Sequence, residues 1–194
     1  MKLNQPDGAT PIREDDLHDL IPALTIQDEL NEFEQKNIES AAQWATRSRK
    51  IKSAFPDLET IKLLHEKMFD ETWKWAGEFR KVELSIGIEW SHIASEIKKL
   101  ADDVSYWLKH STYLPDEIAY RFHHRLVFIH PFKNGNGRHA RLATDLLMAG
   151  MGIEPFTWGA QQLKKKGAPR ATYIAALKAA DSGDFSLLAK FVRT

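Results

Sequence analysis

The chain has 194 residues, a length that suits one domain with a sizeable hydrophobic core. Its 27 basic and 27 acidic residues balance, so no overall charge favours direct binding to nucleic acid. The absence of cysteine excludes disulfides, thiol nucleophiles and cysteine-bound zinc. No stretch approaches the roughly 18 apolar residues of a membrane span. The polar N-terminus also lacks the apolar core of a signal peptide, and we therefore expect a cytoplasmic protein without a membrane partner.

Taken in chain order, the sequence pattern predicts an irregular arm, then helices interrupted by one extended segment. Three prolines and one glycine break up residues 1–24, which we interpret as an irregular N-terminal arm before a single domain at 25–194. In residues 79–90, β-favouring side chains alternate with polar residues or glycine, which is typical of strands. Helical periodicity is found at residues 26–48, 58–72, 92–110, 115–130, 138–150, 169–181 and 184–193.

Residues 130–141, HPFKNGNGRHAR, are the most informative segment of the chain. They follow an apolar run that reads as the end of a buried helix, and they lead into another helical stripe. A glycine-rich loop that opens a helix is suited to bind an anion, because its backbone N–H groups point inward and the helix N-terminus carries partial positive charge.

Two arginines strengthen the prediction of an anion site. Arg138 and Arg141 are three residues apart, so they share a face of the first helical turn, where a cation opposes the helix dipole by roughly 0.3–1 kcal/mol. A polyphosphate between them offsets this cost. The alternative, an ordinary Gly-Asn turn with two solvated arginines, leaves the neighbouring histidine unexplained.

The segment resembles the Fic motif, HPFx(D/E)GNGRxxR, at every specified position except Asn134. Residues 75–87 resemble the Fic flap, 121–130 the helix before the motif, and 171–192 the closing helices. The resemblance implies a mainly α Fic fold, a compact helical bundle with one short β-hairpin flap beside the active-site loop. The segment ELNEFEQKNI at 29–38 and the short chain are similar to the bacterial subgroup called mobile mystery protein B.

This resemblance implies a protein adenylyltransferase that moves AMP from ATP to a Ser, Thr or Tyr hydroxyl of a target protein. His130 would be the general base that deprotonates the hydroxyl. Gly135, Asn136 and Gly137 would cradle the phosphates, and Arg138 and Arg141 would stabilise charge on the leaving pyrophosphate and the γ-phosphate.

Asn134 departs from the family, which has Asp or Glu at the position that binds Mg²⁺. An amide oxygen brings no negative charge, so we expect weaker metal binding at Asn134. Three readings stay open: Mg²⁺ bound mainly through the nucleotide, a donor other than ATP, or a slow enzyme. We favour the first, because the other motif positions are intact.

The family's flap holds an extended target segment by main-chain hydrogen bonds, which presents the target hydroxyl to the histidine. The matching residues are Val82, Glu83, Leu84, Ser85, Ile86 and Gly87. The alternative is a plain surface hairpin.

Many Fic proteins are inhibited by a helix with the motif (S/T)xxxE(G/N), whose glutamate pairs with the second motif arginine. Thr25 to Glu29 matches its first part, within a helix expected at 25–48, so Glu29 is the candidate inhibitory residue. The same residues also match an ordinary helix start. Inhibition by a separate antitoxin-like protein is the other hypothesis.

Two other functions are consistent with the motif. A Doc-like kinase would transfer the γ-phosphate of ATP, although Gly137 and Arg138 keep the Fic pattern. A silent protein would bind nucleotide or a partner without turnover. The sequence names neither the target protein nor an oligomeric state.

Overall fold

The computed structural model describes residues 14–159 and 168–194, in which nearly all regular structure is helical. The mainly α fold predicted from the sequence is therefore confirmed. The elements in chain order are η1 (Glu14–Asp19), α1 (Gln27–Arg47), α2 (Arg49–Ala54), α3 (Leu58–Phe69), η2 (Trp90–His92), α4 (Ile93–His110), α5 (Pro115–Ile129), α6 (Asn136–Gly150), α7 (Ala168–Asp181) and α8 (Ser186–Val192).

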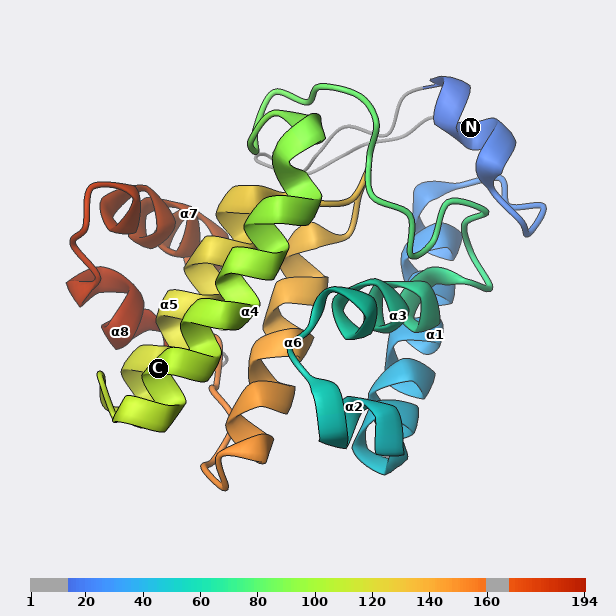
Figure 1. Ribbon diagram of the computed structural model, residues 1–194. Coiled ribbons are helices and arrows are strands. Elements are labelled where there is room, and N and C mark those ends of the chain that lie inside the picture. Colours follow the sequence, from blue (N-terminus) through green and yellow to red (C-terminus); the bar gives the residue numbers. More distant parts are fainter. Residues whose placement is uncertain (1–13, 160–167) are drawn as a thin grey trace.

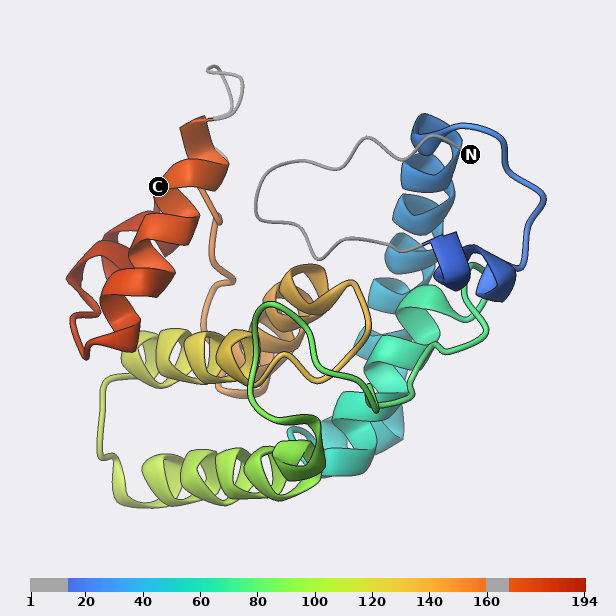
Figure 2. The same cartoon turned by 90° about the horizontal axis from the view of Figure 1, so that it is seen from above.

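Helices α4, α5 and α6 form the centre of the bundle, with α1 to α3 on one side and α7 and α8 on the other (Figure 1). Figure 2 shows α4 and α5 running side by side, joined by a short turn. The buried residues of α5 include Phe122, Leu126 and Ile129, which recur on one helical face. Because α5 and α6 are both anchored in the core, the loop between them is held firmly at each end.

A second apolar cluster joins the C-terminal helices to the ends of α5 and α6. Its fully buried members include Ala119 of α5, Met148 of α6, Ala176 of α7 and Leu188 of α8. The closing helices are therefore packed beside the helix that follows the motif.

The helices begin and end close to the predicted positions, with three differences. The helix expected at 58–72 ends at Phe69, three residues early. The helix expected at 26–48 ends at Arg47, because Ser48 adopts an extended conformation and its hydroxyl accepts the Ile51 N–H at 3.4 Å to start α2. Helix α6 begins at Asn136, two residues earlier than predicted, directly after Gly135 in the left-handed region.

The β-hairpin predicted for residues 79–90 is wrong, since no strand is formed in this described segment. Its one bridge joins Phe79 to Phe132 of the motif loop. The buried guanidinium of Arg80 explains the difference. It donates to the carbonyls of Val82 at 2.9 Å and His130 at 2.8 Å, and to that of Ile88. These bonds to one side chain replace the ladder of a hairpin.

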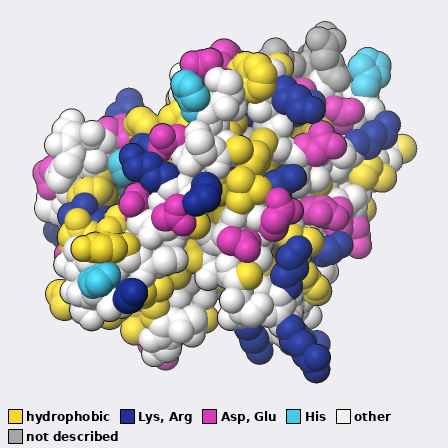
Figure 3. Space-filling view, in the orientation of Figure 1, with side chains coloured by type: hydrophobic (Ala, Val, Ile, Leu, Met, Phe, Trp, Pro, Cys, Tyr) yellow, Lys and Arg dark blue, Asp and Glu magenta, His cyan; other side chains and the backbone are white. Residues whose placement is uncertain are grey.

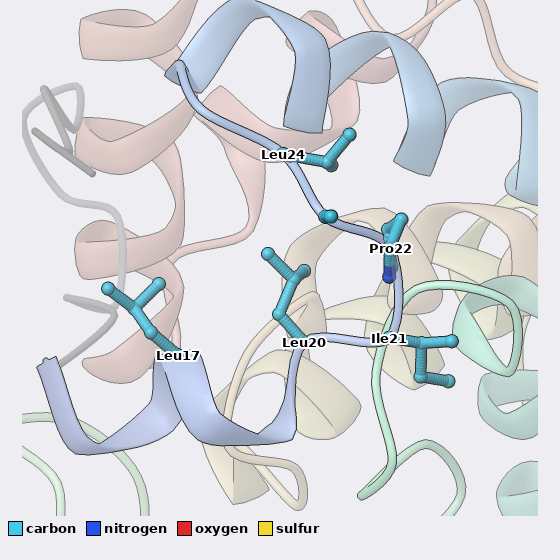
Figure 4. Close-up of a pocket in the computed structure, with 6 residues that line it drawn as sticks. Leu17, Leu20, Ile21, Pro22 and Leu24 are labelled. Atoms are coloured by element: carbon cyan, nitrogen blue, oxygen red, sulfur yellow. The ribbon is translucent and has the colours of Figure 1, made fainter.

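The arm predicted at 1–24 lies partly outside the described residues, which begin at 14. Residues 14–24 are attached to the domain, because the N–H of Ile21 donates to Thr72 at 2.9 Å and Lys133 forms an ion pair with Asp19 at 3.2 Å. Figure 4 shows a pocket lined by Leu17 and residues 20–24 of this arm. None of its lining residues belongs to the motif loop.

No helix among the described residues is long and apolar enough to cross a membrane. On the face shown in Figure 3, acidic and basic side chains are interspersed, and no continuous basic patch is visible there.

Candidate active site

The motif loop runs from His130 to Gly135, between the end of α5 and the start of α6. His130 adopts the left-handed conformation with φ 53°, which turns the chain out of the helix. Gly87 of the flap crosses directly over it: a Cβ on Gly87 would lie 2.6 Å from the Cβ of His130, and its φ is 102°. Only glycine fits this crossing without a shift.

His130 is buried, and burial lowers the pKa of its imidazole to about 4, with the charge of Arg80 adding to the effect. The ring also donates to the Val127 carbonyl, which opposes this shift. A neutral imidazole that donates through one nitrogen carries its acceptor lone pair on the other. His130 therefore has the protonation state of a base at neutral pH.

Asn136 closes the loop with its side chain. Its Oδ1 accepts the Phe132 N–H at 2.9 Å, and its Nδ2 donates to the Phe132 carbonyl at 2.8 Å. The Asn136 amide thus braces the loop, so a phosphate cradle would come from backbone N–H groups. The first-turn amides of α6 have no carbonyl partner within their own helix, as at any helix N-terminus.

Aromatic rings support the loop from below. Phe132 is fully buried and stacks on His65 of α3, with ring centres 3.6 Å apart. The N–H of Gly77 donates to His65 Nδ1 at 3.0 Å, so Nε2 carries the proton and donates to the Asn134 carbonyl at 3.1 Å. His65 thus fixes the loop from a distant helix. His65 lies 65 residues before the motif, and nothing in the sequence around it indicated this contact.

Asn134 directs its side-chain oxygen at its own loop, where Oδ1 accepts the Gly135 N–H at 2.6 Å. The described residues contain no cluster of three His, Cys, Asp or Glu that could hold a metal. One neutral oxygen fits a cation carried in by nucleotide phosphates, and it does not fit a metal resident in the protein alone.

The two arginines have different surroundings. Arg138 Nη1 pairs with Glu34 Oε2 of α1 at 2.6 Å, and Trp73 Nε1 donates to the other oxygen of Glu34 at 2.7 Å. Arg141 lies beside Tyr173 of α7, with its guanidinium carbon 6.0 Å from the ring centre. Burial lowers the pKa of Arg141 from its usual high value. The Arg138 guanidinium therefore faces α1, and that of Arg141 faces α7.

Glu29, the candidate inhibitory residue, caps the start of its own helix in the structure, and its inhibitory role stays a prediction. Glu29 is exposed, and its carboxylate accepts the N–H groups of Thr25 at 2.9 Å and Ile26 at 3.3 Å, as an ordinary helix start does. These bonds lower the pKa of Glu29. The α1 glutamate that contacts a motif arginine is Glu34, five residues later. Spacing in the sequence could not identify it. Glu34 lies on the buried face of α1, where it contacts Arg138, whereas Glu29 lies on the exposed face.

The expected target-docking residues lie beside His130. Val82, Glu83, Ser85, Ile86 and Gly87 are exposed, while Leu84 is partly buried. The segment is attached to the loop by the Arg80 N–H, which donates to Pro131 at 2.9 Å, and by the guanidinium bonds described above. A largely exposed segment without strand structure therefore borders the candidate base, with Gly87 against His130.

The family model that matches the sequence is that of the Fic/DOC family, over residues 55–148. This match to the Fic/DOC family spans just under half of the chain. Protein adenylyltransferase fic-1 of Caenorhabditis briggsae is 34% identical over 121 residues, which cover 60% of this chain and 22% of that protein. Protein adenylyltransferase Fic of Drosophila virilis is 33% identical over 119 residues, with 60% and 23% covered.

Solved structures share the fold of this Fic/DOC domain. Fic-1 of C. elegans, residues 134–508, superposes with a TM-score of 0.70 at 25% identity, covering 90% of this chain and 50% of that one. BepC of Bartonella tribocorum, solved with bound AMPPNP, has a TM-score of 0.66 at 17% identity and covers 97% and 93%. The chain spans 22% to 23% of the length of the two curated relatives named above.

Proposed function

We propose that this Fic/DOC protein transfers AMP from ATP to a hydroxyl group of a target protein. The observation that carries the proposal is the buried, neutral His130, placed between the exposed flap and the N-terminus of α6. The relatives named protein adenylyltransferase support the reaction, and a similar fold binds AMPPNP in BepC.

In the proposed reaction, His130 takes the proton of the target hydroxyl as its oxygen attacks the α-phosphorus of ATP. A new oxygen–phosphorus bond forms, the bond from the α-phosphorus to the bridging oxygen breaks, and pyrophosphate leaves. The amides at the start of α6, Arg138 and Arg141 stabilise the negative charge of the phosphates. Mg²⁺ held by the phosphates would neutralise further charge, with Asn134 as a weak oxygen ligand.

The flap supplies the proposed target site. Extended target backbone would pair with residues 82–87, which are largely exposed and reach the base at Gly87. Such pairing recognises the main chain of the target, and it is consistent with a protein substrate of unspecified sequence. An antitoxin-like partner, the mobile mystery protein B subgroup and a cytoplasmic location stay predictions.

Glu34 supports a resting state for the proposed enzyme. Its carboxylate neutralises Arg138, so a phosphate must displace it before Arg138 can bind the nucleotide. We propose that this ion pair restrains activity, although it engages the first motif arginine and not the second, with which Glu29 is expected to pair.

The experiment uses ATP labelled in the α or the γ position, with a lysate as the source of targets. We expect α-label on protein with the wild type and none with His130→Ala. His110→Ala changes an exposed histidine at the end of α4. It is the matched control and should transfer label normally. Transfer of the γ-label would instead identify a kinase. Nucleotide binding without either label would identify a silent protein.

A further inference from the structure

Arg141 is held by residues that lie outside the motif. Tyr173, on α7, lies beside the Arg141 side chain, whose guanidinium carbon is 6.0 Å from the Tyr173 ring centre. The Tyr173 hydroxyl lies 2.9 Å from His123 Nε2 of α5. Tyr173 therefore lies between an arginine of α6 and a buried histidine of α5, and it lies beyond the segment matched to the family.

The direction of each hydrogen bond follows from counting protons. Thr144 donates its single hydroxyl proton to the Ala140 carbonyl at 2.7 Å, so its oxygen can only accept from His123 Nδ1, 3.3 Å away. His123 is fully buried, which lowers the pKa of its imidazole to about 3, and the ring is neutral. With the proton on Nδ1, His123 Nε2 must accept a hydrogen bond that the Tyr173 hydroxyl donates. The lone pairs of the Tyr173 oxygen are then left to accept from Arg141.

The ring of His123 cannot easily reorient. The Trp158 ring packs on it with centres 4.5 Å apart, and Trp158 Nε1 donates to Asp145 Oδ1 at 3.0 Å. Asp145 lies one helical turn after Arg141, so its carboxyl group is part of the same cluster.

We propose that Tyr173 and His123 are positioning residues that orient Arg141 toward the β- and γ-phosphates of the nucleotide. The inference rests on the proposed function, in which Arg141 contacts those phosphates. Neither residue touches the reacting atoms. They act by presenting a phenolic oxygen as a fixed acceptor, so the guanidinium loses less freedom when it binds phosphate.

The test compares the binding of ATP and AMP by calorimetry in wild type, Tyr173→Phe, Arg141→Ala and the double variant. Tyr173→Phe should weaken ATP binding about tenfold, as expected for one hydrogen bond to a charged group. AMP binding should stay unchanged, because AMP lacks the phosphates that Arg141 would contact. If Tyr173 had only a structural role, Tyr173→Phe would weaken the binding of ATP and AMP alike. Tyr120→Phe, in the same apolar cluster, is the matched control and should bind both normally.

The single and double variants together distinguish a failure of the inference about Tyr173 from a failure of the proposed role of Arg141. In the Arg141→Ala background, Tyr173→Phe should cause no further loss of ATP affinity, and an additive loss would overturn the inference. Weak ATP binding by Arg141→Ala with normal binding by Tyr173→Phe would also overturn it, while leaving the proposed function intact. Normal ATP binding by Arg141→Ala would overturn the role of Arg141 itself. Thermal unfolding of each variant identifies any that fail to fold.

Discussion

Single residues of the site owe their properties to burial more than to residue type. An exposed histidine has a pKa near 6.5, and burial lowers that of His130 to about 4. A carboxylate on an exposed helix face pairs weakly, whereas Glu34 is buried and pairs with Arg138 at 2.6 Å. Two predictions follow from these environments.

The first prediction concerns the pH dependence of the reaction. Only neutral His130 can accept a proton, and its lowered pKa keeps it neutral until the pH falls toward about 4. We therefore expect kcat/KM to be flat from pH 8 to pH 5.5, since this parameter reports the free enzyme. Circular dichroism at each pH verifies that the protein is folded. A loss of half the activity near pH 6.5 would contradict the lowered pKa.

The second prediction concerns Glu34→Gln. The glutamine keeps an oxygen for the Trp73 N–H but removes the charge that holds Arg138. We expect ATP to bind about tenfold more tightly, equivalent to about 1.4 kcal/mol, and AMP transfer to increase. Glu32→Gln, on the exposed face of the same helix, is the control and should match the wild type. Unchanged or weaker ATP binding by a folded Glu34→Gln protein would exclude a restraining role.

At the scale of elements, the flap and the motif loop behave as one unit. Arg80 is the link, since its side chain bonds to carbonyls of the flap and to that of His130. Buried carbonyls left without partners cost about 1–3 kcal/mol each, so the flap and the loop are expected to open together.

The third prediction tests this unit with Gly87→Ala. The new methyl group would lie 2.6 Å from the His130 Cβ, at a backbone φ of 102° that disfavours alanine. We expect a stability loss of about 1–3 kcal/mol, as for strained backbone, and at least a tenfold loss of AMP transfer. The measurements are urea unfolding and the labelling rate.

Gly150→Ala is the matched control for this substitution. No atom lies within 4 Å of a Cβ at Gly150, which ends helix α6. Alanine there should leave activity unchanged and stability equal or higher by about 0.5–1 kcal/mol. Equal behaviour of the two glycine variants would refute the close crossing over His130.

For the whole molecule, buried neutral histidines make stability depend on pH. The pKa of His123 is lowered to about 3, those of His130 and His139 to about 4, and that of His65 well below 6.5, each chiefly by burial. Below pH 6.5 these rings bind protons in the unfolded chain but stay neutral in the folded protein. The free energy of unfolding therefore falls as the pH decreases below 6.5. Asp145 acts in the opposite direction, because burial raises its pKa to about 6.

The fourth prediction is therefore an acid-sensitive fold. Four histidines gain protons on unfolding and one aspartic acid loses one, which gives a net uptake of about three protons between pH 6 and 4. The free energy of unfolding should fall steeply as the pH decreases from 6.5 to 4.5. Urea unfolding at pH 7.5, 6.5, 5.5 and 4.5 measures this slope. His110→Gln, at an exposed site, should keep the slope, and a flat profile would contradict the buried neutral histidines.

The sequence by itself determined the helices and the motif loop. Apolar spacing fixed α4 and α5, and the order of histidine, glycines and arginines in residues 130–141 indicated a phosphate site. These signals are local, because helical periodicity and turn chemistry depend on residues only a few positions apart.

Tertiary structure alone decided which side chains support that loop. His65, Arg80 and Tyr173 lie 32 or more positions from the motif arginines, and their spacing carries no signature. The hairpin prediction failed because Arg80 supplies donors that a strand ladder would otherwise provide. Glu34 rather than Glu29 meets Arg138 because packing of α1 against α3 and α6 buries one face of that helix. Burial and long-range contact depend on the whole fold, so local sequence could not reveal them.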